Sequence, residues 1–378
     1  MTDRATTQSE TRANRVTIGV LADPEAAPAE IGAAMQDELA DALSERIDDD
    51  RDWQVLVRHE RLPSGTPGSH REMMDLATRR RDQQGWDVVV CLTDLPMRHG
   101  RQPLVADADP HRGVGLLSLP AFGALFLRRR VRAAMVQVVA LLSEGAESWR
   151  AAAAQDRKSL PGSLRWTPDD ELDDDHGGAQ MVAGKGRTRL LIGMVRDNRP
   201  WRLVAGLTSA LAAAFAFSAF WLANAQIWEL SQALSAPRLV IIAVGAVLAM
   251  VAWLILGHGL WERPSHDREP EREHAMLLNA STVLTLLIGV LVMGAALFVG
   301  NLTAGSLLVE GGVLREHAMV EPSPVAYVRL AWLATSVALV AGAVGSGFES
   351  DAAVREAVYS FRERERRAAA DDDHTDVA

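Results

Sequence analysis

Four long apolar stretches in the C-terminal half constrain this chain more than any other feature. They cover residues 203–228, 239–261, 276–300 and 324–348. Arg329, near the start of the fourth, is the only charged side chain within them. A helix needs about 20 apolar residues to cross a hydrocarbon core of roughly 30 Å. The sequence therefore predicts an all-α bundle of four transmembrane helices between residues 203 and 348.

Arginines flank these stretches unevenly. They are dense in residues 187–202, in the loop 262–275 and in the tail 349–378, and sparse in the loops 229–238 and 301–323. Positively charged flanks stay on the cytoplasmic side of a membrane. We therefore predict a multi-pass protein of the inner (cytoplasmic) membrane, with both termini and loop 262–275 in the cytoplasm.

Small residues recur four positions apart in three of the four stretches. This spacing lets helices approach closely, and it favours either a compact bundle or a homo-oligomer. The pairs are Ala210 and Ala214, Ala296 and Gly300, and Ala343 and Gly347. Acids and histidines are missing deep within the stretches, so a transport role would require polar groups gathered by oligomerisation.

The first half of the chain alternates strand-like and helix-like segments. Apolar runs at 16–21, 53–58 and 86–93 have the length of buried strands, and amphipathic stretches at 29–46, 71–84 and 128–142 have the length of helices. Shorter extended pieces are expected at 103–106 and 113–118. Such alternation is typical of βαβ units. It predicts an α/β cytoplasmic domain over residues 15–145, with a partly parallel sheet covered by helices on both faces.

The remaining segments are mostly polar, apart from the short apolar run TRLLIGMV at 188–195. Residues 1–14 are expected to be disordered, and 146–186, which include the acidic run DDELDDD, are expected to form an acidic linker. Residues 187–202 are predicted to be a juxtamembrane segment along the inner membrane surface. The tail 349–378 is charged and cytoplasmic, with the last helix expected to continue to about residue 370.

Two aspartates stand directly after predicted strands. Asp23 follows the first strand and Asp94 the third. If these strands are neighbours in the sheet, both carboxylates face the crevice where α/β sheets bind ligands. There they could hold Mg²⁺ or act as acid and base. The competing interpretation is that each is only the polar end of a core strand, or part of a solvated loop.

A second acidic group lies in the segment DADPH. Asp107, Asp109 and His111 alternate there, so they share one side if the segment is extended. Hard cations accept this kind of ligand set. Surface loops of an Asp-rich protein also produce such spacing by chance.

Several common chemistries are disfavoured. Glycine is missing after the first strand, where a dinucleotide-binding loop would have it, and no zinc-ligand or nucleophile-elbow motif occurs, so no cofactor is identified. The formal net charge of −10 gives no reason to expect nucleic-acid binding. Cys91 is the one cysteine and fits an inert core residue.

Two resemblances add to this picture. The order LTDLP, VGLLSLP and then the helix 128–142 resembles the front half of archaemetzincin-type zinc proteases over residues 86–142. It implies a zincin-like shape without the enzyme, because that helix has no histidine to ligate zinc. The run GMVRDNRPWRLVAGL (193–207), leading into four spans, is similar to uncharacterised four-span membrane proteins of high-GC Gram-positive bacteria, and implies no activity.

Three functions fit these patterns. The first is a membrane protein whose α/β module has a binding, regulatory or scaffolding role, without catalysis. The alternatives are a membrane-tethered metal-dependent enzyme using Asp23 and Asp94, and an oligomeric transport component. The lipid bilayer is the one partner that the sequence specifies, and no protein partner is indicated.

Overall fold

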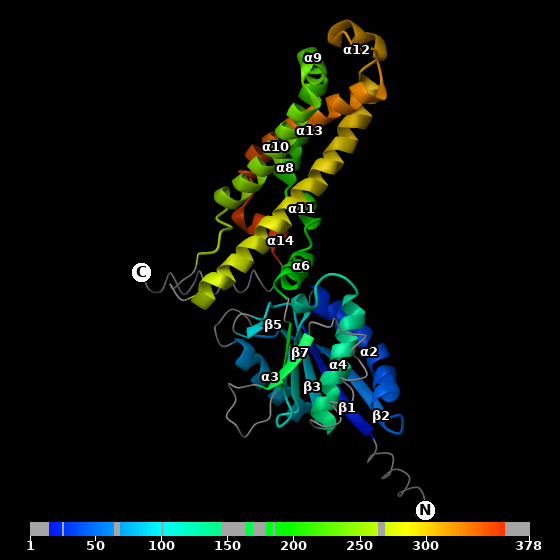
Figure 1. Cartoon of the computed structure of the whole chain (residues 1–378), viewed down its shortest axis with the longest axis vertical. Coiled ribbons are helices and arrows are strands. Elements are labelled where there is room, and N and C mark those ends of the chain that lie inside the picture. The colour runs from blue at the N-terminus through cyan, green and yellow to red at the C-terminus, as the bar shows by residue number, and fades with distance from the viewer. Residues whose placement is uncertain are drawn as a thin grey trace, which may run out of the picture. The chain divides into compact units, whose positions relative to one another are not determined.

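The computed structural model describes residues 15–24, 26–63, 69–99, 102–144, 164–168, 179–183, 186–263 and 269–359. These residues fall into two compact units, one ending at Asp197 and one covering Asn198–Tyr359. The first unit is an α/β domain and the second is helical. An α/β part followed by a helical part is therefore present (Figure 1).

The first unit begins with alternating strands and helices. In chain order they are β1 (Arg15–Ala22), α2 (Ala26–Arg46), β2 (Asp52–His59), α3 (Ser69–Gln84), β3 (Val88–Thr93), β4 (Arg98–His99), β5 (Gln102–Asp109) and β6 (Val114–Ser118). The short helix η1 (Leu119–Phe122), α4 (Leu127–Glu144), β7 (Leu164–Pro168), β8 (Ala179–Ala183) and α6 (Arg187–Asp197) complete it.

One mixed sheet organises this unit. Its strand order is β2-β1-β3-β6-β5-β8-β7, with β4 paired to β5. The strands β2, β1, β3 and β6 run parallel, and the remaining pairings are antiparallel. Figure 1 shows α3 on one face and α2 and α4 on the other. The two faces are also distinguished in β6, where Leu116 joins the apolar cluster of α3 while Gly115 lies against Val138 of α4.

The predicted linker 146–186 needs correction. Two of its segments, β7 and β8, extend the sheet beyond β5, and Met181 of β8 is fully buried. The unit also continues through α6 to Asp197 instead of ending near residue 145. The outer edge of β5 has unpaired backbone N–H and C=O groups, and a neighbouring segment can form hydrogen bonds with them. The five-residue segments β8 and β7 therefore become strands by pairing there. The rest of the linker, and residues 1–14, lie outside the described residues.

The second unit contains eight described helices. They are α7 (Arg202–Gly206), α8 (Thr208–Leu222), α9 (Ala225–Ala233), α10 (Ala236–Gly257), α11 (Glu269–Leu308), α12 (Gly311–Ala318), α13 (Pro324–Ser346) and α14 (Asp351–Val358). Among the described residues, α10, residues 275–308 of α11, and α13 are long and apolar enough to cross a membrane. A fourth span is counted if the helical stretches 187–206 and 208–222, bent by 53°, act as one. The chain is thus a membrane protein.

The predicted first span, 203–228, is not one continuous helix. Leu207 leaves helical geometry with φ −104° and ψ 67°, which separates α7 from α8. Asn224 starts α9, because its side chain accepts a hydrogen bond from the backbone N–H of Gln226 at 3.1 Å. An Asn cap of this kind favours a new helix start over continuation. Apolar composition alone does not reveal either break.

Small residues pack α8 closely against α13. Ala210 and Ala214 are fully buried. A Cβ on Gly342 would lie 3.2 Å from the carbonyl oxygen of Ala210, and one on Gly345 would lie 2.5 Å from the Cβ of Ala213. The first predicted small-residue pair therefore sits in a close helix contact.

The other two pairs differ. Ala296 and Gly300 are both exposed, and a Cβ on Gly300 would meet nothing within 4 Å. Ala343 is buried, whereas Gly347 is exposed and ends α13. Oligomerisation through such faces stays a prediction.

Polar groups inside this unit bind one another. Asn301 of α11 donates to the hydroxyl of Thr335 of α13 at 3.0 Å. Arg329 donates to the carbonyl oxygens of Ser231 at 3.2 Å and Gln232 at 3.3 Å, so its charge caps the C-terminal end of α9. His258 Nδ1 lies 2.8 Å from Asp351 Oδ1 at the start of α14.

The end of α13 also differs from expectation. The helix stops at Ser346, and Ser350 starts the separate helix α14 by accepting a hydrogen bond from the backbone N–H of Ala353. The predicted continuous helix to about residue 370 is therefore interrupted after Ser346. Residues 360–378 lie outside the described part of the chain.

We expect Gly345→Val to destabilise the second unit. A branched side chain would force α8 away from α13, and overpacking of this kind costs about 1–3 kcal/mol. Thermal unfolding of the full chain in detergent micelles measures the effect as a lower Tm. Gly300→Val makes the same change where the structure is open and should leave Tm nearly unchanged. Equal Tm values for the two variants would contradict the close packing of α8 on α13.

Candidate functional site

The strand order reverses between β1 and β3. Both strands are parallel neighbours, with Leu21 opposite Cys91 and Ala22 opposite Leu92. From β1 the chain moves outward to β2 on one side and then returns to β3 on the other. Open α/β sheets bind ligands at such a reversal, outside the carboxyl ends of the strands. We define this edge of β1, β3 and their neighbours as the carboxyl edge.

Asp23 and Asp94 both lie at the carboxyl edge. Asp23 comes directly after β1 and Asp94 directly after β3. The condition set by the sequence, that these strands be neighbours, is met. Asp23 is 2% exposed and Asp94 5% exposed. Both are therefore buried and not solvated, and the ionised form of a buried carboxylate is stable only with hydrogen bonds or opposite charge around it.

Two hydroxyl groups fix the loop that carries Asp94. Thr93 accepts a hydrogen bond from the backbone N–H of Leu95 at 3.2 Å. Ser118, opposite Thr93 in β6, donates to the carbonyl oxygen of Leu95 at 2.7 Å and accepts from the backbone N–H of Met97 at 3.3 Å. The loop is therefore held from two strands. A rigid loop keeps Asp94 in place without help from a ligand.

A third carboxylate, Glu60, follows β2 at the same edge. Its backbone N–H donates to the carbonyl oxygen of Ala22 at 3.0 Å. The guanidinium of Arg80, from α3, donates through Nε to both carboxylate oxygens at 2.8 Å. Hydrogen bonding to Glu60, together with the charge of Glu60, raises the pKa of Arg80. Sequence reasoning missed Glu60, although its position directly after the strand WQVLVRH is the same signal that marked Asp23.

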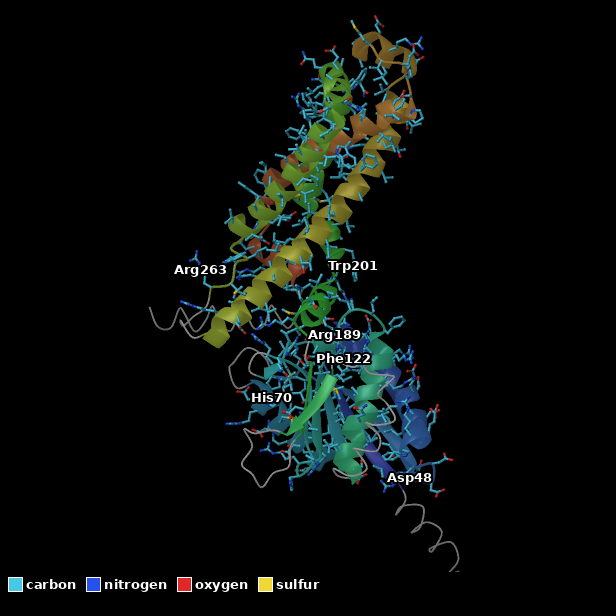
Figure 2. All side chains as sticks on the ribbon, in the orientation of Figure 1. Asp48, His70, Phe122, Arg189, Trp201 and Arg263 are labelled. Atoms are coloured by element: carbon cyan, nitrogen blue, oxygen red, sulfur yellow. The ribbon has the colours of Figure 1, made fainter. Side chains whose placement is uncertain are left out.

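His70 and Asp107 form a close pair in the same unit. His70, labelled in Figure 2, is in the first turn of α3. Its Nε2 lies 2.6 Å from Asp107 Oδ2 of β5. The Asp107 side chain is 4% exposed and that of His70 is 41% exposed. Asp107 is opposite Leu116, which is opposite Cys91, so the pair lies on the α3 face of the sheet. His70 follows a Pro- and Gly-rich loop, and nothing in its local sequence marks it.

Of the predicted group, Asp107 and Asp109 are both in β5 and share one face of it, as expected for an extended segment, whereas His111 lies beyond the strand. Asp107 contacts His70, whereas Asp109 accepts a hydrogen bond from the backbone N–H of Arg112 at 3.1 Å within the hairpin turn. His111 is exposed on that turn. Within the described ranges, no three His, Cys, Asp or Glu side chains are grouped to hold a metal ion. A metal site here stays a prediction that the geometry does not favour.

Cys91 lies in the middle of the same region and is fully buried. Burial raises the pKa of its thiol, and the negative charges of Asp23 and Glu60 raise it further. The thiol therefore remains protonated and is a poor nucleophile. This agrees with the interpretation of Cys91 as an inert core residue. The same effect on the pKa of Cys91 shows that the charges of Asp23 and Glu60 reach β3.

Comparisons of the chain with protein-family models, with curated proteins and with solved structures find no match. The resemblances to archaemetzincin-type proteases and to four-span membrane proteins of high-GC Gram-positive bacteria therefore stay predictions. The function has to be inferred from the geometry of the carboxyl edge.

We expect Cys91 to resist alkylation in the folded protein. The full chain in detergent at pH 8 should take up almost no maleimide, because the thiol is buried and its raised pKa keeps it protonated. Mass spectrometry after the reaction measures the uptake. Denaturation in guanidinium should make the same residue react fully. Rapid labelling of the folded chain would show that β3 opens readily.

Proposed function

We propose that this is a multi-pass membrane protein whose α/β module binds a ligand at the carboxyl edge and acts in regulation or scaffolding. The observation that carries the proposal is the strand reversal between β1 and β3, which brings two buried carboxylates, Asp23 and Asp94, to one edge. The uneven arginine distribution supports an inner-membrane protein. It also supports a cytoplasmic location for the α/β module and for both chain ends.

The charges at the edge indicate what kind of ligand fits. Glu60 is already matched by Arg80, and the hydroxyls of Thr93 and Ser118 are used by the loop backbone. Asp23 and Asp94 are the two buried carboxylates at this edge. An ammonium or guanidinium group on a small molecule or a peptide would complement them, since charge-assisted hydrogen bonds to carboxylates are among the stronger ones.

A metal-dependent enzyme is the second candidate. The close approach of His70 to Asp107 favours it, because a carboxylate beside an imidazole is a frequent arrangement for proton transfer. Asp23 and Asp94 would then hold a divalent cation, and His70 would act as acid or base. The binding module would take an organic cation at the carboxyl edge, and the enzyme a divalent metal ion. The choice of cationic probe therefore separates the two candidates.

The transport alternative has less support. Its polar path would have to run through the membrane helices. Asn301 and Thr335 are buried there and hydrogen-bonded to each other. Their polarity is therefore explained by helix packing and does not indicate a transport path. An oligomer axis lined by polar groups is still required for this function.

We expect one class of cationic probe to raise the Tm of the full chain in detergent micelles. The probes are arginine methyl ester and spermidine for the binding module, and MgCl₂ and MnCl₂ for the enzyme. At about a hundred times Kd, a ligand that binds only the folded state adds about 2.7 kcal/mol, which corresponds to roughly 5–10 °C. The variants Asp23→Asn and Asp94→Asn should lose this shift.

A matched control lies at the opposite edge of the sheet. Asp52, at the start of β2, forms an exposed ion pair with Arg15, so Asp52→Asn should keep the full probe response. A shift caused by the divalent cations alone, and lost in Asp94→Asn, would favour the enzyme. If no probe changes Tm, or if all three variants respond like the wild type, the carboxyl edge is not the binding site.

A further inference from the structure

Leu125 and Phe126 form an exposed apolar tip on the α/β unit. Their exposed fractions are 69% and 74%, and they lie in the connection between η1 and α4. Single exposed apolar residues are common on proteins. Two large neighbouring apolar side chains at this exposure indicate an interaction site. We refer to these two residues as the tip.

The tip has a fixed shape. Phe126 has φ +54°, a region that bulky residues rarely adopt, and its carbonyl oxygen accepts the first helical hydrogen bond of α4, from Arg130. Arg130 Nη1 donates to the carbonyl oxygen of Phe122 at 2.8 Å, and Arg196 Nη1 donates to that of Gly123 at 2.7 Å. Backbone strain of this kind persists only where surrounding contacts enforce it, and it is frequent at functional sites.

The surface around the tip is positively charged. The first turn of α4 holds Arg128, Arg129 and Arg130 and carries no acid. Positive charge at a helix N-terminus opposes the helix dipole, so this arrangement is unfavourable unless anions are near. Arg189 of α6 lies beside η1 (Figure 2), where burial lowers its pKa and the charge of Arg130 lowers it further.

Acidic side chains near the tip compensate only part of this charge. Glu38 of α2 pairs with Arg128 and also with Arg132, at 3.2 Å for the latter. Asp197 pairs with Arg196. Arg129 is exposed, and the described contacts show no ion pair for it. An anionic partner would therefore be attracted to this surface.

Helix α6 is a built-in part of the same surface. A Cβ on Gly193 would lie 2.0 Å from the carbonyl oxygen of Pro120, so α6 and η1 are in backbone contact. Ile192 of α6 is 49% exposed, which adds apolar area beside the arginines. Only residues 198–201 separate α6 from α7. The chain itself therefore tethers this surface to a bilayer.

We propose that the tip docks on the anionic surface of the membrane that holds the chain. Leu125 and Phe126 enter the headgroup layer, and Arg129 meets lipid phosphates. Apolar side chains flanked by arginines are the pattern of interfacial membrane contacts, and anionic lipids attract basic groups close to their surface. The occupant is a phospholipid surface, and docking would limit the orientations of the ligand-binding module.

The test uses the full chain in lipid nanodiscs. Leu125→Cys is labelled with an environment-sensitive dye, and wild type, whose Cys91 is buried, serves as the labelling blank. Discs contain phosphatidylcholine alone or with phosphatidylglycerol, each with and without spin-labelled lipid. We expect a blue-shifted emission that spin-labelled lipid quenches, and stronger quenching with phosphatidylglycerol. A label on Gln84→Cys, at the exposed end of α3, should not be quenched.

Two further variants separate the apolar and the charged contribution. Phe126→Gly suits the positive φ and removes the ring, so the fold is kept while the ratio of docked to undocked module falls by about tenfold. Arg129→Gln should reduce the difference between the two lipid compositions, whereas Arg79→Gln, exposed on α3, should not.

Two results would overturn the proposal. One is a label at position 125 that spin-labelled lipid leaves unquenched in both compositions. The other is a blue-shifted label that lipid quenchers cannot reach, since protein instead of lipid would then cover the tip.

Discussion

Apolar side chains must leave water, and the two units of this protein satisfy that requirement in different ways. In the α/β unit they pack between a sheet and helices on both of its faces. In the helical unit many of them stay exposed, including Phe220, Ile241 and Leu256 at 62–81%. Such surfaces are stable in hydrocarbon, where a helix satisfies its own backbone hydrogen bonds. Leu125 and Phe126 share this exposure outside the helical unit, which is why a bilayer surface explains them.

The carboxyl edge depends on the sheet for its chemistry. Parallel pairing of β1, β2 and β3 brings Asp23, Glu60 and Asp94 to one side, although 71 positions separate the first from the last. Arg80 matches Glu60, and hydroxyls on β3 and β6 fix the loop of Asp94. The carboxylates are thus held in place by the fold before any ligand arrives. Such preorganisation lowers the ordering cost of binding.

Much of the architecture could be predicted because its signals are local. A long apolar run has few stable alternatives to a membrane helix, so α10, α11 and α13 follow from composition. The strands of the βαβ units follow in the same way from short apolar runs. The breaks at Leu207 and Asn224 could not be predicted, since helices on both sides of each break are apolar. Strands β7 and β8 were missed because their pairing is decided by the open edge of β5, which no local pattern reports.

The sequence by itself determined that the chain enters a membrane, that an α/β domain precedes the membrane helices, and that acids follow the strands. Only the tertiary structure decided that β1 and β3 are neighbours, that His70 meets Asp107 while Asp109 bonds to Arg112, and that α6 packs on η1. The reason is physical. The length of an apolar run and the alternation of strands and helices are local patterns that one segment shows by itself. Strand order and side-chain pairing depend on the free energy of contacts between distant segments, which no single segment reveals.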